Sequence, residues 1–141
     1  MTFWQPGRRL FSTAAILMII TAALHTLGNM SGSVETPDQK KAFAAMEAVR
    51  FPMGMTPSLA DIYWCVTFTM SITFLALGAL NLVVASSNIS PAGLWRVGLV
   101  NAIWVAAFAA LCWRYQVPPP LICAVAIEVV LIAGLLLNRR D

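Results

Sequence analysis

The sequence has little charge and few of the residues that catalytic and metal sites use. Only 11% of its 141 residues are charged, and it has one histidine and three cysteines. Soluble domains are about a quarter charged, so an ordinary soluble domain is excluded. With 60% hydrophobic residues, intrinsic disorder is excluded as well. The nine basic residues lie mostly between apolar runs, so nucleic acid is not an expected partner.

The common catalytic and metal-binding motifs are also missing. There is no glycine-rich phosphate loop, no GxSxG, no HExxH and no pair of carboxylates within an apolar run. Cys65, Cys112 and Cys123 have no CxxC or CxxxC spacing. A pair toward the outer half is one alternative, and packing as small apolar side chains is the favoured one. One histidine cannot supply both ligands of a bis-histidine haem unless a second copy contributes the other. No metal or cofactor is predicted, and the sequence favours a protein without enzymatic activity while leaving this open.

What the sequence does have is long apolar runs. Four membrane-spanning helices of about 20 residues need about 80 apolar residues, and 60% of 141 is about 85. The predicted spans cover residues 10–27, 62–85, 94–115 and 121–138. They predict an all-α, single-domain bundle of four transmembrane helices. The basic flank of the first run also fits a secretory signal, but the run is long for a signal core, which favours a retained helix.

Helix start signals precede the later spans and lie within the one long connection. Ser58 and Ser90 are placed to cap the second and third spans. Thr36 and the three residues after it combine a cap, a first-turn proline and a capping-box glutamine. Apolar residues then recur at helical spacing and predict a short amphipathic helix at 37–50, lying on the bilayer or over the bundle end. A second interpretation makes this helix, with Phe43, a lid over a cavity.

Basic residues near the span ends indicate the orientation. One side holds five arginines, which are Arg8, Arg9, Arg96, Arg139 and Arg140. The other side holds Lys40, Lys41, Arg50 and Arg114. The positive-inside rule therefore places both termini in the cytoplasm by a narrow margin, in a multi-pass protein of the plasma or inner membrane. The lipid bilayer is its expected surrounding.

Glu128 is the most informative residue, because it lies about halfway along the fourth span with no other charge in that span. A charge at that depth costs about 2.5–3.5 kcal/mol on insertion scales, so Glu128 should face the protein interior. It could carry a proton, contact a ligand or clamp helices together. Trp104 lies deep in the third span, and its indole N–H is a candidate partner for the carboxyl group.

The predicted spans also contain uncharged polar residues and one histidine that could contact other helices or a ligand. His25 lies near the outer end of the first span, where it could cap or join helices or act as a ligand or proton relay. Four residues of the second and third spans are candidates for hydrogen bonds between helices, namely Asn81, Asn101, Thr67 and Ser71.

Short motifs connect the end of the first span with the start of the second. They are His25-Thr26-Leu27-Gly28, an H-T-x-G motif, followed by Met53-Gly54, Ser58, Asp61 and Tyr63. In this first half the chain resembles a group of small uncharacterised bacterial four-helix integral membrane proteins. The resemblance implies a bacterial membrane protein and supplies no activity. It favours His25, Asp61 and Tyr63 as one outward-facing cluster.

Two functions are compatible with these features. The first is a non-enzymatic accessory or interaction subunit, with a second copy or another membrane protein as partner. The short loops, a ridge of alanines in the third span and the missing catalytic motifs favour it. The alternative is a small-molecule binding or transport protein, or a membrane enzyme for an apolar substrate. Glu128 would then lie at mid-depth, with His25, Asp61 and Tyr63 at the outer mouth.

Overall fold

The computed structural model describes residues 6–31, 36–52 and 54–138. Within these ranges the chain forms helices and no strands. The helices are α1 (Pro6–Met30), α2 (Pro37–Ala48), α3 (Leu59–Ser86), α4 (Pro91–Arg114) and α5 (Pro118–Asn138). All except α2 are long and apolar enough to cross a membrane. The predicted all-α bundle is confirmed, and the chain is a multi-pass membrane protein.

The helices extend beyond the apolar runs that predict them. The 28 residues of α3 rise about 42 Å, whereas the hydrocarbon core of a bilayer is about 30 Å thick. The first turn of α3, which contains Asp61, therefore lies ahead of the apolar stretch that starts at Ile62. Helix α2 ends at Ala48, two residues before its predicted end, because Val49 is extended and Arg50 then pairs with Ser58 in an isolated β-bridge.

Local sequence sets where the helices begin. Thr36 caps α2, and Gln39 completes the capping box by accepting a hydrogen bond from the Thr36 backbone N–H. Ser90 caps α4, which has a proline in its first turn. Gln116 takes a left-handed φ of 55° in the turn between α4 and α5, which reverses the chain just before Pro118.

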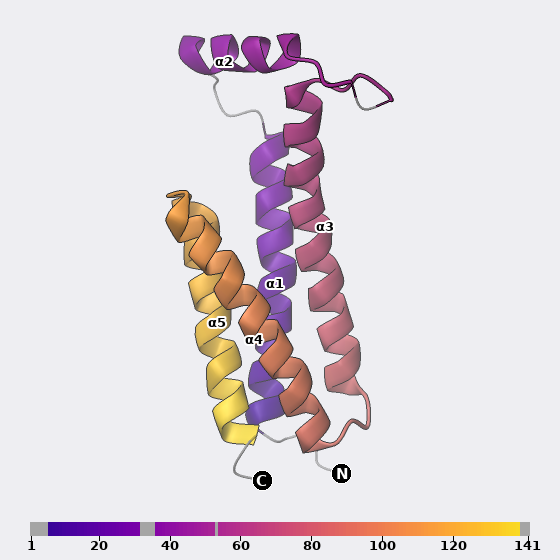
Figure 1. The fold of residues 1–141 in the computed structure, drawn as a ribbon. Coiled ribbons are helices and arrows are strands. Elements are labelled where there is room, and N and C mark those ends of the chain that lie inside the picture. The colour runs from indigo at the N-terminus through magenta and orange to yellow at the C-terminus, as the bar shows by residue number, and fades with distance from the viewer. Residues whose placement is uncertain (1–5, 32–35, 53, 139–141) are drawn as a thin grey trace.

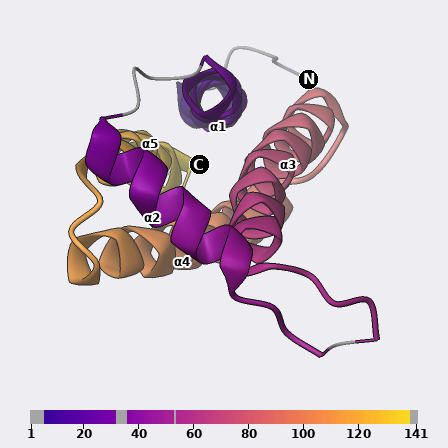
Figure 2. The same ribbon diagram turned by 90° about the horizontal axis from the view of Figure 1, so that it is seen from above.

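The four long helices run side by side, with α2 lying across the end of the bundle where α3 begins (Figure 1). Helix α1 contacts both α3 and α5, and α4 packs against α5. Seen from above, α1, α3, α4 and α5 surround a common interior (Figure 2). Helix α1 begins and α5 ends at the far end from α2 (Figure 1).

Glycines bring the helices close together, among other places, where α1 crosses α3 and where α4 crosses α5. Gly78 of α3 lies against the backbone of Ala15 and Ile19 in α1. Gly98 of α4 lies under the side chain of Leu135 in α5. The largest fully buried side chains fill the space around these crossings: Phe74, Met18, Leu94, Ile127, Leu131, Val105 and Asn81.

Arg8 of α1 holds the end of α3 in place. Its guanidinium donates to the carbonyl oxygens of Ala85, Ser87 and Ile89 at 2.8, 2.7 and 2.9 Å. The last carbonyls of a helix lack partners within the helix and form the negative end of its dipole. The guanidinium of Arg8 therefore provides hydrogen bonds for carbonyl oxygens both at the end of α3 and in the turn into α4. From the sequence, Arg8 is only part of a basic flank, since nothing local points to residues 77 to 81 positions away.

Candidate functional site

Glu128 projects from one edge of the face that α5 buries. Leu131, one turn later, is 1% exposed. The Oε2 atom of Glu128 is buried and has no hydrogen-bond partner among the described residues. Leu135, two turns after Glu128, packs over Gly98 of α4. Because α4 and α5 are antiparallel, Glu128 lies at the level of Val105, two turns after Gly98.

Trp104 lies on another side of α4, facing α3. Its ring meets Phe74 edge-on at a centroid distance of 5.0 Å and stacks on Phe108 at 5.8 Å. Phe74 and Phe108 also meet edge-on, at 5.1 Å. The three rings fill the space between α3 and α4, so Trp104 serves helix packing there. The Oε2 atom of Glu128 receives no hydrogen bond from the indole.

Asn81 of α3 and Asn101 of α4, a pair for which the sequence suggests an interhelical contact, exchange two hydrogen bonds. Asn81 Nδ2 donates to Asn101 Oδ1 at 3.0 Å, and Asn101 Nδ2 donates to Asn81 Oδ1 at 3.1 Å. Asn101 also donates to the carbonyl oxygen of Val97 at 2.9 Å. Both side chains are buried. The exchange satisfies the two amides in a region without bulk water.

His25 and Ser71 continue the buried faces of α1 and α3. The buried residues of α1 recur every three or four positions up to Thr21, and His25 is the next in this series. Ser71 precedes Phe74 in the corresponding series of α3. His25 Nε2 and Ser71 Oγ are both buried, and neither has a hydrogen-bond partner within the described part of the chain.

The register of α1 against α3 places His25 and Ser71 at the same level. Gly78 packs against Ala15 and Ile19. The helices are antiparallel, so Ser71, two turns before Gly78, lies at the level of the α1 residues two turns after this contact. His25 is among those residues. Two buried polar atoms without partners therefore occur at one level of the bundle.

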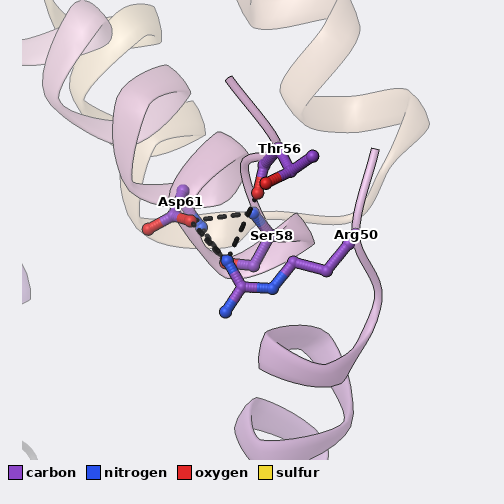
Figure 3. Close-up of polar contacts among 4 residues, drawn as sticks. All are labelled: Arg50, Thr56, Ser58 and Asp61. Atoms are coloured by element: carbon purple, nitrogen blue, oxygen red, sulfur yellow. Dashed lines mark hydrogen bonds and ion pairs between the residues drawn. The ribbon is translucent and has the colours of Figure 1, made fainter. Parts of the chain in front are cut away.

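Asp61 closes a capping box at the start of α3 (Figure 3). Its Oδ2 accepts hydrogen bonds from the Ser58 hydroxyl at 2.7 Å and the Ser58 backbone N–H at 2.8 Å. Arg50 Nη1 lies 3.9 Å from the same oxygen, in an exposed ion pair, and donates to the carbonyl oxygen of Thr56 at 3.3 Å. The hydroxyl bond, then the backbone bond, lower the pKa of Asp61, and the charge of Arg50 acts in the same direction.

Tyr63 belongs to the contact that holds α2 on α3. The Phe43 ring meets Tyr63 edge-on at 5.7 Å and stacks on Trp64 at 6.2 Å. Trp64 in turn stacks on Phe68 at 5.9 Å. Half-buried Phe43 thus anchors a helix that has no fully buried residue.

The structure gives His25, Asp61 and Tyr63 different surroundings. Asp61 bonds to Ser58 and Tyr63 packs on aromatic rings, as described above. His25 lies at the level of Ser71, ten residues or about 15 Å beyond Asp61 along α3. Thr67, half-buried on α3, has no hydrogen bond to another helix in the described ranges.

Two open cavities follow the seam between α1 and α3. One, of about 610 Å³, lies toward α2 and is lined mostly by apolar residues such as Ala22 and Ala23, together with Ser71. The other, of about 700 Å³, lies at the opposite end and is lined by residues that include Arg8 and Ser12. Neither Glu128 nor His25 lines these two cavities.

The fold and these groups define a multi-pass helical membrane protein that has isolated polar side chains in its interior. The residues that the structure describes hold no group of three or more His, Cys, Asp and Glu side chains that could bind a metal ion. Comparisons with protein-family models, curated proteins and solved structures find no match.

Proposed function

We propose that this chain binds or transports a small molecule in the cell membrane, with Glu128 as a proton-carrying group inside the bundle. One observation carries the proposal: Glu128 Oε2 is buried at mid-span without a hydrogen-bond partner among the described residues. Ionisable residues at this depth are costly and commonly mark proton or substrate pathways.

The asparagine pair supports this choice over a purely structural role. Asn81 and Asn101 show how this bundle satisfies a polar contact between helices, with two reciprocal hydrogen bonds. A carboxyl group that served as a clamp would be expected to have a donor of the same kind, because an unmade hydrogen bond in an apolar interior is costly. Glu128 Oε2 has none among the described residues.

His25 is the second polar group of the proposed pathway. Its Nε2 is also buried without a partner among the described residues, and imidazole nitrogens can donate or accept hydrogen bonds. His25 and Glu128 lie on the contacting helices α1 and α5 but at different levels, because Gly134 of α5 packs against Gly7 and Phe11 at the start of α1. A proton passing between the two groups would need bridging water. A polar ligand could bridge them with its own polar atoms.

Proton flux into vesicles tests this function. The purified chain is reconstituted into vesicles containing a pH-sensitive dye, and the external pH is lowered. Wild-type protein should speed acidification above the protein-free rate, and Glu128→Gln should remove the increase. Glu47→Gln, on the exposed surface of α2, is the matched control and should behave as wild type. A wild-type rate equal to that of empty vesicles, or unchanged flux in Glu128→Gln, would contradict the proposal.

A second candidate function is an accessory subunit that binds another membrane protein or a second copy. Helix α2 favours it, because it has no buried residue and extends across the bundle end on a single aromatic anchor (Figure 1). The alanine ridge of the third predicted span lies on α4 and includes Ala106 and Ala110, which are exposed. These small side chains would allow a helix of the partner to pack closely against α4. Purification in mild detergent should then retain a stoichiometric partner or a dimer. A monomer without any partner would count against this function.

We further propose that both termini face the cytoplasm, so that α2 lies on the outer surface. The test uses Lys41→Cys in α2 and Ser87→Cys in the turn between α3 and α4. With Cys65, Cys112 and Cys123 replaced by serine, a membrane-impermeant maleimide added to intact cells should label Lys41→Cys alone. Labelling of Ser87→Cys alone would reverse the orientation.

A further inference from the structure

The open cavity between α1 and α3 that lies toward α2 is a groove with the size of a small-molecule site. Its volume of about 610 Å³ lies within the range of about 300–1,000 Å³ that is common for such sites. Its walls include Ala22, Ala23 and Thr26 of α1, and Phe68, Ser71 and Ile72 of α3. No lining residue is charged. The groove therefore suits an uncharged, largely apolar molecule.

Ser71 gives the groove a polar group that is free to bond. Its side chain is 7% exposed, and its hydroxyl has no partner in the described part of the chain. Other hydroxyls of α1 and α3 bond to the carbonyl four residues earlier, among them Thr26, Thr69 and Thr73 at 2.9, 2.7 and 2.8 Å. The Ser71 hydroxyl can turn about its Cα–Cβ bond toward the groove without breaking a hydrogen bond.

The depth of Ser71 restricts the kind of molecule that could reach it. Ser71 lies nine residues after Ile62, about 13 Å along α3, near the middle of a hydrocarbon core about 30 Å thick. A charged headgroup is costly at this depth. The oxygen that bonds to Ser71 must therefore belong to a neutral molecule and sit on an apolar chain or ring.

We propose that this groove binds a neutral apolar molecule from the bilayer that carries a hydrogen-bonding oxygen, with Ser71 as its polar contact. This goes beyond the function proposed above, because Glu128 does not line the groove. Such a molecule would reach the site sideways from the lipid and would not pass through the bundle end.

The test uses methyl stearate that carries a nitroxide at mid-chain, whose oxygen accepts hydrogen bonds. Its electron paramagnetic resonance spectrum reports both restricted motion and hydrogen bonding to the nitroxide. With the full chain in lipid nanodiscs, wild-type protein should give a motionally restricted, hydrogen-bonded component. Ser71→Ala should lose the hydrogen-bonding signature and weaken binding about fivefold, the effect of one neutral hydrogen bond. Thr69→Ala, on an exposed part of α3, is the matched control and should bind as wild type.

Two further variants locate the site. Ala23→Trp places a large ring in the groove and should abolish the restricted component, whereas Ala107→Trp, on an exposed face of α4, should retain it. The inference is overturned if wild type gives no more restricted probe than Ala23→Trp, or if Ser71→Ala keeps the full hydrogen-bonding signature. Loss of binding in Glu128→Gln, with Ser71→Ala unchanged, would also overturn it while supporting the proposed function.

Discussion

Replacing Gly78 with alanine tests the close crossing of α1 and α3. A Cβ atom at this position would lie 2.7 Å from Ile19 Cγ1 and 2.8 Å from the Ala15 carbonyl oxygen. Ordinary contact begins at 3.4 Å, so α1 and α3 must separate by about 0.6 Å, the difference between 3.4 and 2.8 Å. The Ala15 oxygen belongs to the backbone of a helix and cannot rotate away.

The expected loss follows from two opposing effects. Overpacking costs about 1–3 kcal/mol, and a contact with backbone puts Gly78→Ala in the upper part of that range. Alanine also recovers up to about 1 kcal/mol of helix propensity. The net loss of unfolding free energy should be about 1–2 kcal/mol, measured by circular dichroism in mixed micelles with increasing denaturing detergent.

Gly28→Ala is the matched control for this experiment. Gly28 also lies within a helix, but an added Cβ there meets nothing within 4 Å. Only the propensity gain remains, so Gly28→Ala should be as stable as wild type or more stable. If Gly78→Ala proved as stable as Gly28→Ala, the close approach of α1 and α3 would be wrong.

Three further predictions concern the polar contacts. Arg8→Gln should lower the unfolding free energy by about 1.5–3 kcal/mol, because three carbonyls lose a charged donor. The exposed control Lys41→Gln should leave the unfolding free energy unchanged. Equal stability of the two variants would refute the role of Arg8. Asn101→Leu should lower the unfolding free energy by about 1 kcal/mol in the same assay. Adding Asn81→Leu should recover part of this loss, because no amide is then left unpaired. A further loss of unfolding free energy in the double variant would contradict the pairing. The lowered pKa of Asp61 means that its capping contribution is present above its ordinary pKa of about 3.9 and is lost as the pH falls through the lowered value. Unfolding followed from pH 7 downward should show this loss in wild type and not in Asp61→Asn, and identical profiles would exclude it.

The sequence was sufficient for the fold because the signals that set it are local. Apolar runs of span length predict four helices, and Thr36, Ser58 and Ser90 mark starts that the structure shows as caps. The predicted ends of the spans were less accurate, because the helices continue through polar turns outside the bilayer. The end of α2 depends on the β-bridge between Arg50 and Ser58, which no local pattern announces.

The candidate site was less predictable because it depends on which faces meet. The sequence shows Trp104 and Glu128 at similar depth but not that Trp104 faces α3, where it packs on Phe74. His25 and Asp61 belong to segments at one end of the bundle, yet α3 rises about 15 Å between Asp61 and the level of His25. The free hydroxyl of Ser71 is visible only in three dimensions, because most serines in membrane helices could bond to their own backbone. The bacterial resemblance of the first half stays a prediction.

We infer that Glu128, half-buried and without a hydrogen-bond partner among the described residues, can be reached from the apolar phase. Dicyclohexylcarbodiimide, a lipid-soluble reagent for carboxylic acids, tests it directly when the modified peptides are identified by mass spectrometry. This reagent should modify Glu128, a water-soluble carbodiimide should not, and the vesicle activity should be lost in step with the modification. Glu128 left unmodified by the lipid-soluble reagent in folded protein would contradict the claim.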